Sequence, residues 1–373
     1  MLHKAERGIF ELKQGRALCV TDAERAACAL VAAVEDLSIE RLEQLRSLAV
    51  PPRLIVTPHR ARAMGIHAAE GGANLSLPLG TDETPDTIIG LGTDPRAADA
   101  RLGLEARPAT RMESAGLALT RFARLLPTLV AVDVDPKAPL LTRWIEDGEI
   151  LEVSTEDVDE AVARSSIEIT RVAEAPVPLA GAELSRFVFF REGGGFLEHV
   201  AVLIGPRESW PDPVPVRLHS ACLTGDLFSS LRCDCGEQLR GSLEYFKKQG
   251  GGVLVYLAQE GRGIGLGNKI RAYTLQETGL DTVDADGVLG FGADERNYDA
   301  AVAILHHLQI TRVELLTNNP LKVAAVEESG IEVVERTPIY GGINRHNLRY
   351  VQAKVDRSGQ WLMDMISQPV SAD

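Results

Sequence analysis

Three of the five cysteines in this chain lie in one short segment, residues 218–239, which reads LHSACLTGDLFSSLRCDCGEQL. Cys233 and Cys235 are one residue apart, and a turn can return Cys222 to them. Three thiolates suit a tetrahedral Zn²⁺ ion, and a fourth position left for water is typical of a catalytic zinc site. The spacing is not that of the Cys-x2-Cys pairs in zinc fingers, so buried or free thiols remain the alternative. We therefore treat the three cysteines as candidate metal ligands.

Composition sets the remaining bounds. The 373 residues are enough for about two domains, and 45% hydrophobic and 25% charged residues are usual for a globular protein. A formal net charge of −14 and the lack of a long basic run argue against nucleic-acid binding. We find no apolar run of about 20 residues for a membrane span and no signal-peptide core. We expect a cytoplasmic protein, whose reduced thiols favour metal over disulfides.

The first half alternates apolar runs with helical patterns, which predicts a layered α/β domain. We expect strands at residues 17–20, 54–56 and 129–134, and helices at 112–125 and 155–163. The Ala-rich run AERAACALVAAVE (23–35) predicts another helix, capped by Asp22. The Pro- and Ala-rich stretch 175–182 indicates a linker or domain entry, so we place a boundary near residue 171. The fold class predicted for the whole chain is mixed α/β with two domains.

The second half carries a Gly-rich turn between a strand and a helix. An apolar run at 253–257 leads into QEGRGIG (259–265), and residues 268–278 form a helical pattern. Such a turn lets backbone N–H groups and Arg262 approach phosphates, although its glycine spacing matches neither a dinucleotide-binding motif nor a P-loop. Farther along, Asn319 and Pro320 begin a helix with Lys322 in its first turn. A cation there opposes the helix dipole, which favours a phosphate contact over a solvated surface lysine.

Together these segments resemble the GTP cyclohydrolase II family, the zinc enzymes at the entry to riboflavin synthesis. The resemblance extends from the cysteine segment through YLAQEGRGIGLGNKIRAYTLQETGLDT (256–282), GFGADERNYD (290–299) and LLTNNPLKV (315–323). It covers about Val172 to Leu362. It implies hydrolysis of GTP to a diaminopyrimidine ribosylamino phosphate, formate and pyrophosphate. Zinc suits this chemistry because it lowers the pKa of a bound water and polarises a carbonyl.

The resemblance also implies roles for single residues. Cys222, Cys233 and Cys235 hold the zinc, and Tyr273 orients the water or relays a proton. Asp294 acts as acid and base, and the family's arginine, here Arg296, is proposed to attack the α-phosphorus. Since a protonated arginine is a poor nucleophile, chemistry favours a charge clamp at Arg296 instead. The implied GTP pocket consists of Arg217, His219, Ser220, Gln238, Glu260, Gly261, Arg262, Thr282, Thr317 and Lys322. Mg²⁺ would accompany the triphosphate, and a homodimer is expected.

Three alternatives stay open at this point. One variant of the family keeps the formamide, but it departs at the tyrosine position, where this chain has Tyr273. Relatives in pyrimidine catabolism tend to lose zinc cysteines, and all three are present here. The third alternative is a zinc-stabilised regulatory protein without activity. Two positions depart from the family pattern: Ala221 replaces a usual Glu, and Ala258 replaces a frequent Arg.

The N-terminal half more faintly resembles 3,4-dihydroxy-2-butanone 4-phosphate synthase. Asp22, Glu24 and Arg25 match that family's acidic loop, but its Glu-Asn-Glu-Gly reads Ala-Ala-Cys-Ala at 26–29. Its His-Thr-Glu-Ala reads Met-Glu-Ser-Ala at 112–115. Without those carboxylates and the histidine, a magnesium site should be lost. We expect a degenerate, non-catalytic domain over 1–171 and a cyclohydrolase domain over 172–373.

Overall fold

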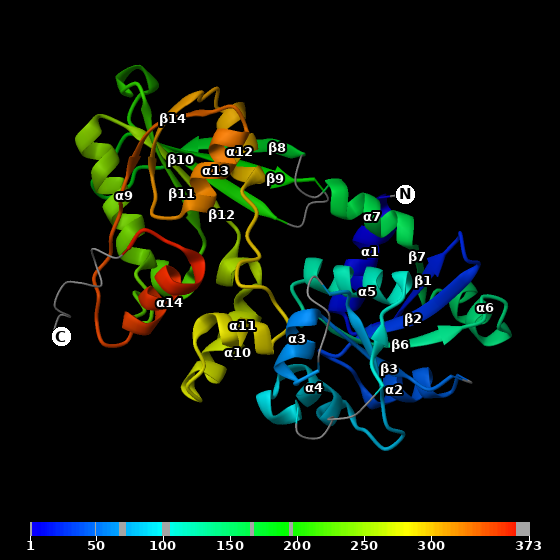
Figure 1. The fold of residues 1–373 in the computed structure, drawn as a ribbon. Coiled ribbons are helices and arrows are strands. Elements are labelled where there is room, and N and C mark those ends of the chain that lie inside the picture. Colours follow the sequence, from blue (N-terminus) through cyan, green and yellow to red (C-terminus); the bar gives the residue numbers. More distant parts are fainter. Residues whose placement is uncertain are drawn as a thin grey trace. The chain divides into compact units, whose positions relative to one another are not determined.

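The computed structural model describes residues 2–48, 50–66, 72–98, 105–164, 168–193 and 197–362. The chain forms two compact units, one of residues 1–163 with 270–293 and the other of residues 164–269 with 294–373. Each unit contains a seven-stranded sheet with helices packed on it (Figure 1). The predicted mixed α/β fold with two domains is therefore confirmed. The chain leaves the first unit at Ala163, whereas residue 171 already lies in a strand of the second unit. No helix among the described residues is long and apolar enough to span a membrane.

The sheet of the first unit has the order β5-β4-β3-β6-β2-β1-β7, and its neighbouring strands are antiparallel except for the parallel pair β1–β7. Its strands are β1 (Leu18–Asp22), β2 (Ala27–Ala33), β3 (Arg53–Val56), β4 (Leu75–Pro78), β5 (Arg107–Pro108), β6 (Thr128–Val134) and β7 (Leu151–Ser154). Its helices are α1 (Leu2–Lys13), α2 (Ile39–Arg46), α3 (Pro58–Ala63), α4 (Pro85–Thr93), α5 (Arg111–Phe122), α6 (Pro139–Glu146) and α7 (Thr155–Arg164).

The helix predicted for residues 23–35 is wrong, because this stretch forms a β-hairpin. Asp22 pairs with Ala27, and Ala26 turns the chain with a φ of 48°. Strand β2 then runs between β1 and β6, where nearly all its side chains are buried. A short apolar run fits a central strand as well as a buried helix, so pairing with two neighbours overrides the helix propensity of alanine. The strands predicted at 54–56 and 129–134 and the helices at 112–125 and 155–163 correspond to β3, β6, α5 and α7.

Helices α1 and α5 bury one face of the first sheet. Ile9 of α1 and Leu119 of α5 join Val20, Val31 and Leu129 in one apolar cluster. The later segment 270–293 belongs to the same unit, and its helix α11 (Thr282–Val288) packs on α3. A part of the cyclohydrolase-like sequence therefore folds with the N-terminal half.

The sheet of the second unit has the order β14-β13-β11-β12-β10-β9-β8. Strands β14, β13, β11 and β12 are parallel, and β12, β10, β9 and β8 are antiparallel. Its strands are β8 (Ile169–Pro176), β9 (Ser185–Glu192), β10 (Glu198–Ile204), β11 (Val214–Ser220), β12 (Gly252–Leu257), β13 (Arg312–Leu316) and β14 (Glu332–Thr337). Its helices are α8 (Leu223–Asp226), α9 (Cys235–Gln249), α12 (Asp299–His307), α13 (Pro320–Glu328) and α14 (Leu348–Ser358), and α10 (Leu266–Glu277) continues from this unit into the other.

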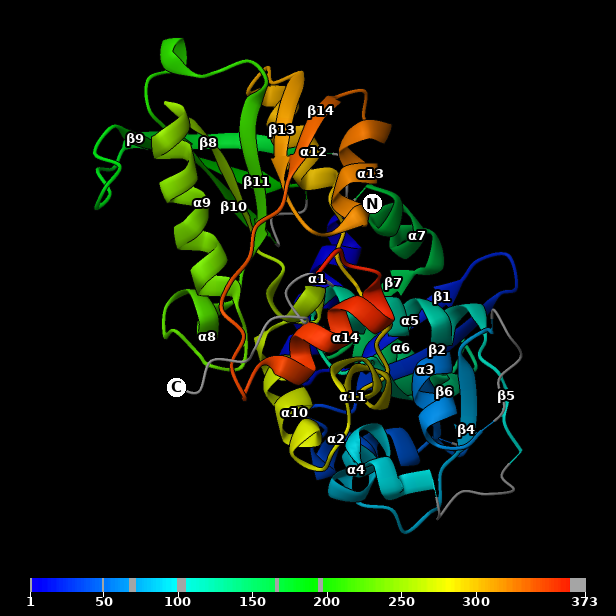
Figure 2. The same ribbon diagram turned by 60° about the vertical axis from the view of Figure 1, so that its left-hand side comes forward.

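Apolar side chains alternate between the two faces of β12, so both faces of this sheet need helices to cover them. Val253 and Val255 join the cluster that contains Ile304 of α12, whereas Leu254 packs with Phe246 of α9. Figures 1 and 2 show α9 on one side of the sheet and α12 and α13 on the other. The parallel strands β11, β12 and β13 end at the same edge, where each leads into one of the predicted motifs. Ligands of parallel α/β sheets bind at such carboxyl ends.

Of the Pro- and Ala-rich stretch 175–182, predicted as a linker or domain entry, only Ala175 and Pro176 lie in a strand. Residues 169–176 form β8, the edge strand of the second sheet, and Pro176 ends it. Its pairing with β9 shifts register between Arg171 and Ala173. An edge strand tolerates proline and irregular pairing because one side of it has no partner. This position explains why the strand lacks a clear alternating pattern in the sequence.

Candidate metal centre and its pocket

The structure brings the three predicted cysteines together at the end of β11. Their sulfur atoms lie within 4.8 Å of one another, and the Cys222 and Cys233 sulfurs are 3.7 Å apart. Sulfur ligands about 2.3 Å from one tetrahedral zinc ion are about 3.8 Å apart, so the spacing fits the ion. Gly225 makes this approach possible, since a Cβ there would lie 2.7 Å from the Cys233 sulfur. The donor set and its spacing thus fit a metal.

Asp226 orients the first cysteine. Its carboxylate accepts hydrogen bonds from the Cys222 backbone N–H (3.0 Å) and the Tyr256 hydroxyl (2.9 Å), and it lies 3.0 Å from His219 Nε2. The His219 ring stacks on Tyr256 with 5.5 Å between the ring centroids. The carboxylate therefore ties β11, β12 and the cysteine segment together.

Lys269 places a cation beside the same sulfur. Its ammonium lies 3.2 Å from the Cys222 sulfur and donates to Glu260 Oε1 (2.9 Å) and Thr224 Oγ1 (2.9 Å). Hydrogen bonds from the Cys233 and Cys235 thiols, together with this ammonium, lower the pKa of Cys222. The same contacts between thiols raise the pKa of Cys233 and Cys235, so the ammonium of Lys269 is the feature that favours a thiolate, the form that binds a metal.

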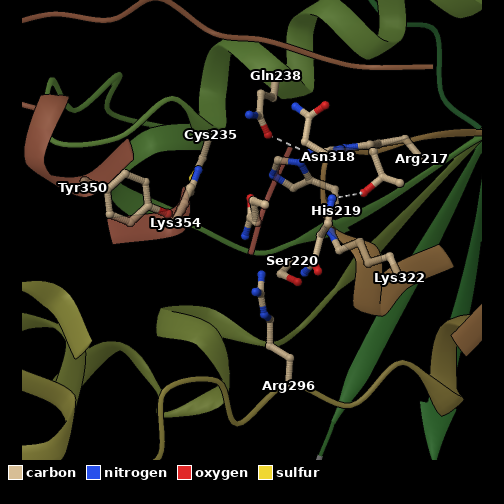
Figure 3. A pocket seen from close by; sticks show the side chains of 13 residues that line it. Arg217, His219, Ser220, Cys235, Gln238, Arg296, Asn318, Lys322, Tyr350 and Lys354 are labelled. Atoms are coloured by element: carbon tan, nitrogen blue, oxygen red, sulfur yellow. Dashed lines mark hydrogen bonds between the residues drawn. The ribbon is translucent and has the colours of Figure 1, made fainter. Parts of the chain in front are cut away.

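A pocket adjoins the cysteines and is lined in part by Cys235. Figure 3 shows its side chains converging from the strand ends, from the loop at Arg296 and from α14. The residues that line it are Arg217, His219, Ser220, Cys235, Gln238, Arg296, Thr317, Asn318, Asn319, Lys322, Tyr350, Lys354 and Gln360. A metal ligand and several cations therefore share one cavity.

Several polar atoms of the pocket have no hydrogen-bond partner among the described residues. They are Arg217 Nε, His219 Nδ1, Ser220 Oγ and Asn318 Oδ1, and all four are buried. Buried polar atoms in folded proteins nearly always have partners, so their convergence indicates a polar ligand. Both donors and acceptors are among them, which suits a molecule with a heterocycle and phosphates.

Two cations give the pocket its charge. Arg217 donates from Nη1 to Leu316 O (2.8 Å) and from Nη2 to Gln238 Oε1 (2.7 Å), and burial lowers its pKa to about 10. Lys322 donates to Leu218 O (2.6 Å) from the first turn of α13. Burial first, and then repulsion by Arg217 and Arg296, lower the pKa of Lys322 well below its usual value. This surplus of positive charge favours an anionic ligand.

The Gly-rich turn packs against the loop that carries Asp294 and Arg296. A Cβ on Gly263 would lie 2.7 Å from Glu295 O, and Glu295 N donates to Arg262 O (3.1 Å). Arg296 Nε donates to Asp294 Oδ1 (2.7 Å), and a second bond joins the same two side chains. Burial opposes ionisation of both groups, but their mutual attraction lowers the pKa of Asp294 and, together with Tyr298, raises that of Arg296. Both therefore stay charged.

The predicted site residues fall into three sets. Seven of the predicted GTP-site and catalytic residues line the pocket, namely Arg217, His219, Ser220, Gln238, Arg296, Thr317 and Lys322. Glu260, Gly261, Arg262 and Asp294 lie in the two loops just described, in the same unit. Tyr273 on α10 and Thr282 at the start of α11 belong to the other unit, so their sequence-based roles stay predictions.

Sequence reasoning missed several contributors to this centre. Four of them are Asp226, Lys269, Tyr350 and Lys354. The first two lie inside recognised motifs, and an acidic residue four positions after a candidate ligand was a usable signal. The last two lie in the C-terminal segment, whose mixed polar sequence carries no spacing signal. Their place emerges only from the fold.

The acidic loop of the N-terminal half holds a guanidinium. Arg111 lies 3.1 Å from Glu156 and 2.8 Å from Asp159, and within 3.9 Å of Asp22 and Glu24. Its hydrogen bond to Asp159 raises the pKa of Arg111, which keeps it cationic. A side chain thus supplies positive charge among these four carboxylates and offsets part of their charge.

Comparison with known proteins finds one family that matches the second half of the chain and relatives that match half or nearly all of it. The sequence model of the GTP cyclohydrolase II family matches residues 170–338. A GTP cyclohydrolase-2 from Azospirillum brasilense is 40% identical over 364 residues, which are 96% of this chain and 94% of that protein. A GTP cyclohydrolase-2 from Pseudomonas paraeruginosa is 49% identical over 191 residues, 51% of this chain and 92% of that protein. A two-domain 3,4-dihydroxy-2-butanone 4-phosphate synthase from A. baumannii covers 90% of this chain and 98% of its own, but its 15% identity and TM-score of 0.35 are too low to establish a shared fold.

The fold and the site define an α/β protein with a three-cysteine candidate metal site beside a cationic pocket. The similarity to the Azospirillum protein covers nearly the full length of both chains and identifies the particular family. The chain belongs to the GTP cyclohydrolase II family.

Proposed function

We propose that this chain opens the imidazole ring of GTP and releases formate and pyrophosphate. The product is 2,5-diamino-6-(5-phosphoribosylamino)pyrimidin-4(3H)-one, and the reaction is the first step of riboflavin biosynthesis. The observation that carries the proposal is the cavity itself, in which a three-thiol metal centre, buried cations and unpartnered polar atoms meet. Ring opening adds water at C8 of guanine and then hydrolyses the resulting formamide.

Cys222, Cys233 and Cys235 would hold one zinc ion. When bound, the ion would supply an acidified water and polarise the formyl carbonyl. Beside it, the unpartnered atoms of His219 and Ser220 are available to hydrogen-bond the substrate. Tyr273 is assigned to proton relay or water orientation by family position alone.

Arg217 and Lys322 would bind the phosphates, since both are buried cations that line the pocket. They offset only part of the charge of a triphosphate, so Mg²⁺ is expected with the substrate. Arg296 is held by two hydrogen bonds to Asp294 and stays protonated, so it would stabilise charge on the α-phosphoryl group rather than attack it. Water would then replace pyrophosphate at that phosphorus.

We assign no synthase activity to the N-terminal half, because Arg111 supplies the positive charge among its carboxylates. A cytoplasmic homodimer is expected from the family resemblance. For the whole chain, the decisive observation is whether formate and pyrophosphate are both released.

The test is incubation of the purified chain with GTP, Mg²⁺ and Zn²⁺, followed by assays for formate and pyrophosphate. We expect the two products in equal amounts, with the absorbance of a diaminopyrimidine. Pyrophosphate without formate would instead support the formamide-retaining variant. Neither product from a zinc-loaded chain would favour the regulatory alternative and contradict the proposal.

A further inference from the structure

The C-terminal helix α14 forms a wall of the pocket. Tyr350 and Lys354 project from it into the cavity, as Figure 3 shows. The segment that follows is tied to the opposite wall, because Trp361 N donates to Asn318 O (2.9 Å). The Trp361 ring also lies 4.8 Å from the Arg336 guanidinium. These contacts fix the helix against the ends of the parallel strands.

Lys354 reaches from this helix to the cysteine segment. Its ammonium lies 2.7 Å from Asp234 Oδ1, and Asp234 stands between the two ligands Cys233 and Cys235. The side chain of Asp234 is 0% exposed and that of Lys354 is 9% exposed. Asp234 occupies the N-cap position of α9, yet its side chain makes no capping hydrogen bond to that helix. The carboxylate is turned away from its usual local partner and toward Lys354.

The second oxygen of Asp234 extends the contact across the pocket. Gln238 Nε2 donates to Asp234 Oδ2 (2.6 Å), and Arg217 Nη2 donates to Gln238 Oε1 (2.7 Å). Lys354, Asp234, Gln238 and Arg217 thus form one buried chain of hydrogen bonds from α14 to β11. The chain includes Asp234, between two candidate metal ligands in the sequence, and ends at the pocket cation Arg217.

Stability alone does not explain a buried ion pair at this place. Apolar residues of similar volume are often as stabilising as a buried pair of charges, because both charges lose their hydration. Lysine side chains usually extend their ammonium groups into solvent, whereas this one is buried against the metal-binding loop. Groups that hold metal ligands in place from outside the ligand shell commonly show this arrangement.

We propose that Lys354 is a positioning residue for the metal centre, acting through Asp234 on the Cys233–Cys235 pair. The inference rests on the proposed function only in that the three cysteines hold zinc. The proposal gives the C-terminal helix α14 a role in positioning the metal ligands. Loss of the ammonium would leave a buried carboxylate uncompensated beside the thiolates, and the loop would move to expose it to water.

The experiment measures the zinc dissociation constant of the full chain by competition with a chromogenic chelator, without substrate. We expect Lys354→Met to weaken zinc binding about 10- to 100-fold, as changes to groups behind metal ligands commonly do. Gln352→Met, an exposed position on the same helix, is the matched control and should bind zinc like the wild type. Lys354→Arg keeps the charge and should restore most of the affinity.

Asp234→Asn provides a second route if Lys354→Met fails to fold, as judged by circular dichroism. It keeps the shape and the contact with Gln238 but removes the charge, so it should weaken zinc binding by a similar factor. If the two residues act as one unit, the double variant should be no weaker than the weaker single variant. A further readout is the absorption spectrum of the cobalt-substituted chain, which should change in Lys354→Met and stay unchanged in Gln352→Met.

The outcomes separate this inference from the proposed function. A zinc-loaded wild type and a folded Lys354→Met with equal zinc affinity would overturn the positioning role and leave the cyclohydrolase proposal intact. With Lys354→Met unfolded, wild-type zinc affinity in Asp234→Asn would overturn it equally. A wild-type chain that binds no zinc would overturn both.

Discussion

Lys322 brings its amino group into the pocket without an ion pair to any described residue. Its ammonium donates to the Leu218 carbonyl and lies 5.6 Å from the centre of the Tyr298 ring. Neither contact replaces a counterion, so burial and the nearby arginines hold its pKa low. A triphosphate beside it would favour the charged form again.

The lowered pKa of Lys322 predicts that nucleotide binding depends on pH. Because the ligand raises a pKa that is low in the free chain, binding takes up a proton. The affinity for a non-hydrolysable GTP analogue should therefore fall as pH rises above the lowered pKa, by up to about tenfold per pH unit. Titration calorimetry from neutral to alkaline pH measures this. Lys322→Met should bind more weakly with little of that dependence, and an unchanged pH profile in this variant would contradict the assignment.

Among secondary-structure elements, those with a motif at their ends were the most predictable. The strand at 253–257 and the helix after Asn319 appear as β12 and α13, because turn glycines, an N-cap and Pro320 mark their limits. The hairpin of β1 and β2 was not predictable in this way. Its alanine-rich strand is defined by the two neighbours it pairs with, and a single sequence does not show those pairings.

The site residues also divide into those that local sequence signals predict and those that depend on distant partners. The cysteines follow from their spacing and Lys322 from its place in a helix, whereas the pocket residues on β11 were implied by the family resemblance. Neither route leads to Lys354, because its partner Asp234 lies 120 positions away in the sequence. Likewise, the segment 270–293 reads as part of the second half but folds with the first.

Helix α3 is joined to α11 through one buried side chain, that of Arg60. It donates to the carbonyls of Leu91 (2.9 Å), Asp94 (2.8 Å) and Val288 (2.8 Å), and it is 0% exposed. Burial lowers its pKa to about 10, so it remains charged at neutral pH. Thr57 adds a bond from its hydroxyl to Gly290 O (2.6 Å).

Arg60→Ala should therefore destabilise the first unit by about 3 kcal/mol or more, since several buried carbonyls would lose their donor. Urea unfolding with hydrogen exchange should show the loss and place part of it at the C-terminal end of α11. Arg62→Ala, at an exposed position of the same helix, should stay within about 0.5 kcal/mol of the wild type. Equal stability of the two variants would show that Arg60 is not the link.

For the molecule as a whole, the N-terminal half forms part of a compact folded unit, although its sequence lacks ligands expected of a magnesium site. Arg111 lies among Asp22, Glu24, Glu156 and Asp159, and no histidine stands at 112. Contacts of Thr57 and Arg60 with residues 288–290 give this half a structural use, because the cyclohydrolase-like sequence depends on it for packing.

The chain should accordingly not convert ribulose 5-phosphate to the four-carbon phosphate and formate, even with Mg²⁺ in excess. Carboxylates and the histidine expected of the magnesium site are absent, and Arg111 offsets part of the charge of the carboxylates that remain. Chromatography of the reaction against a buffer blank checks this, with an active synthase of the resembled family as the positive control. Product above the blank would show that the N-terminal half remains an enzyme.

The central claim is that the three cysteines carry the ring-opening chemistry of a cyclohydrolase. Formate release from GTP by the wild type and by Cys233→Ala tests it most directly, with zinc content measured on the same samples. We predict about one zinc per wild-type chain, and loss of both the metal and formate release in Cys233→Ala. A metal-free Cys233→Ala chain that releases formate at the wild-type rate would contradict the claim.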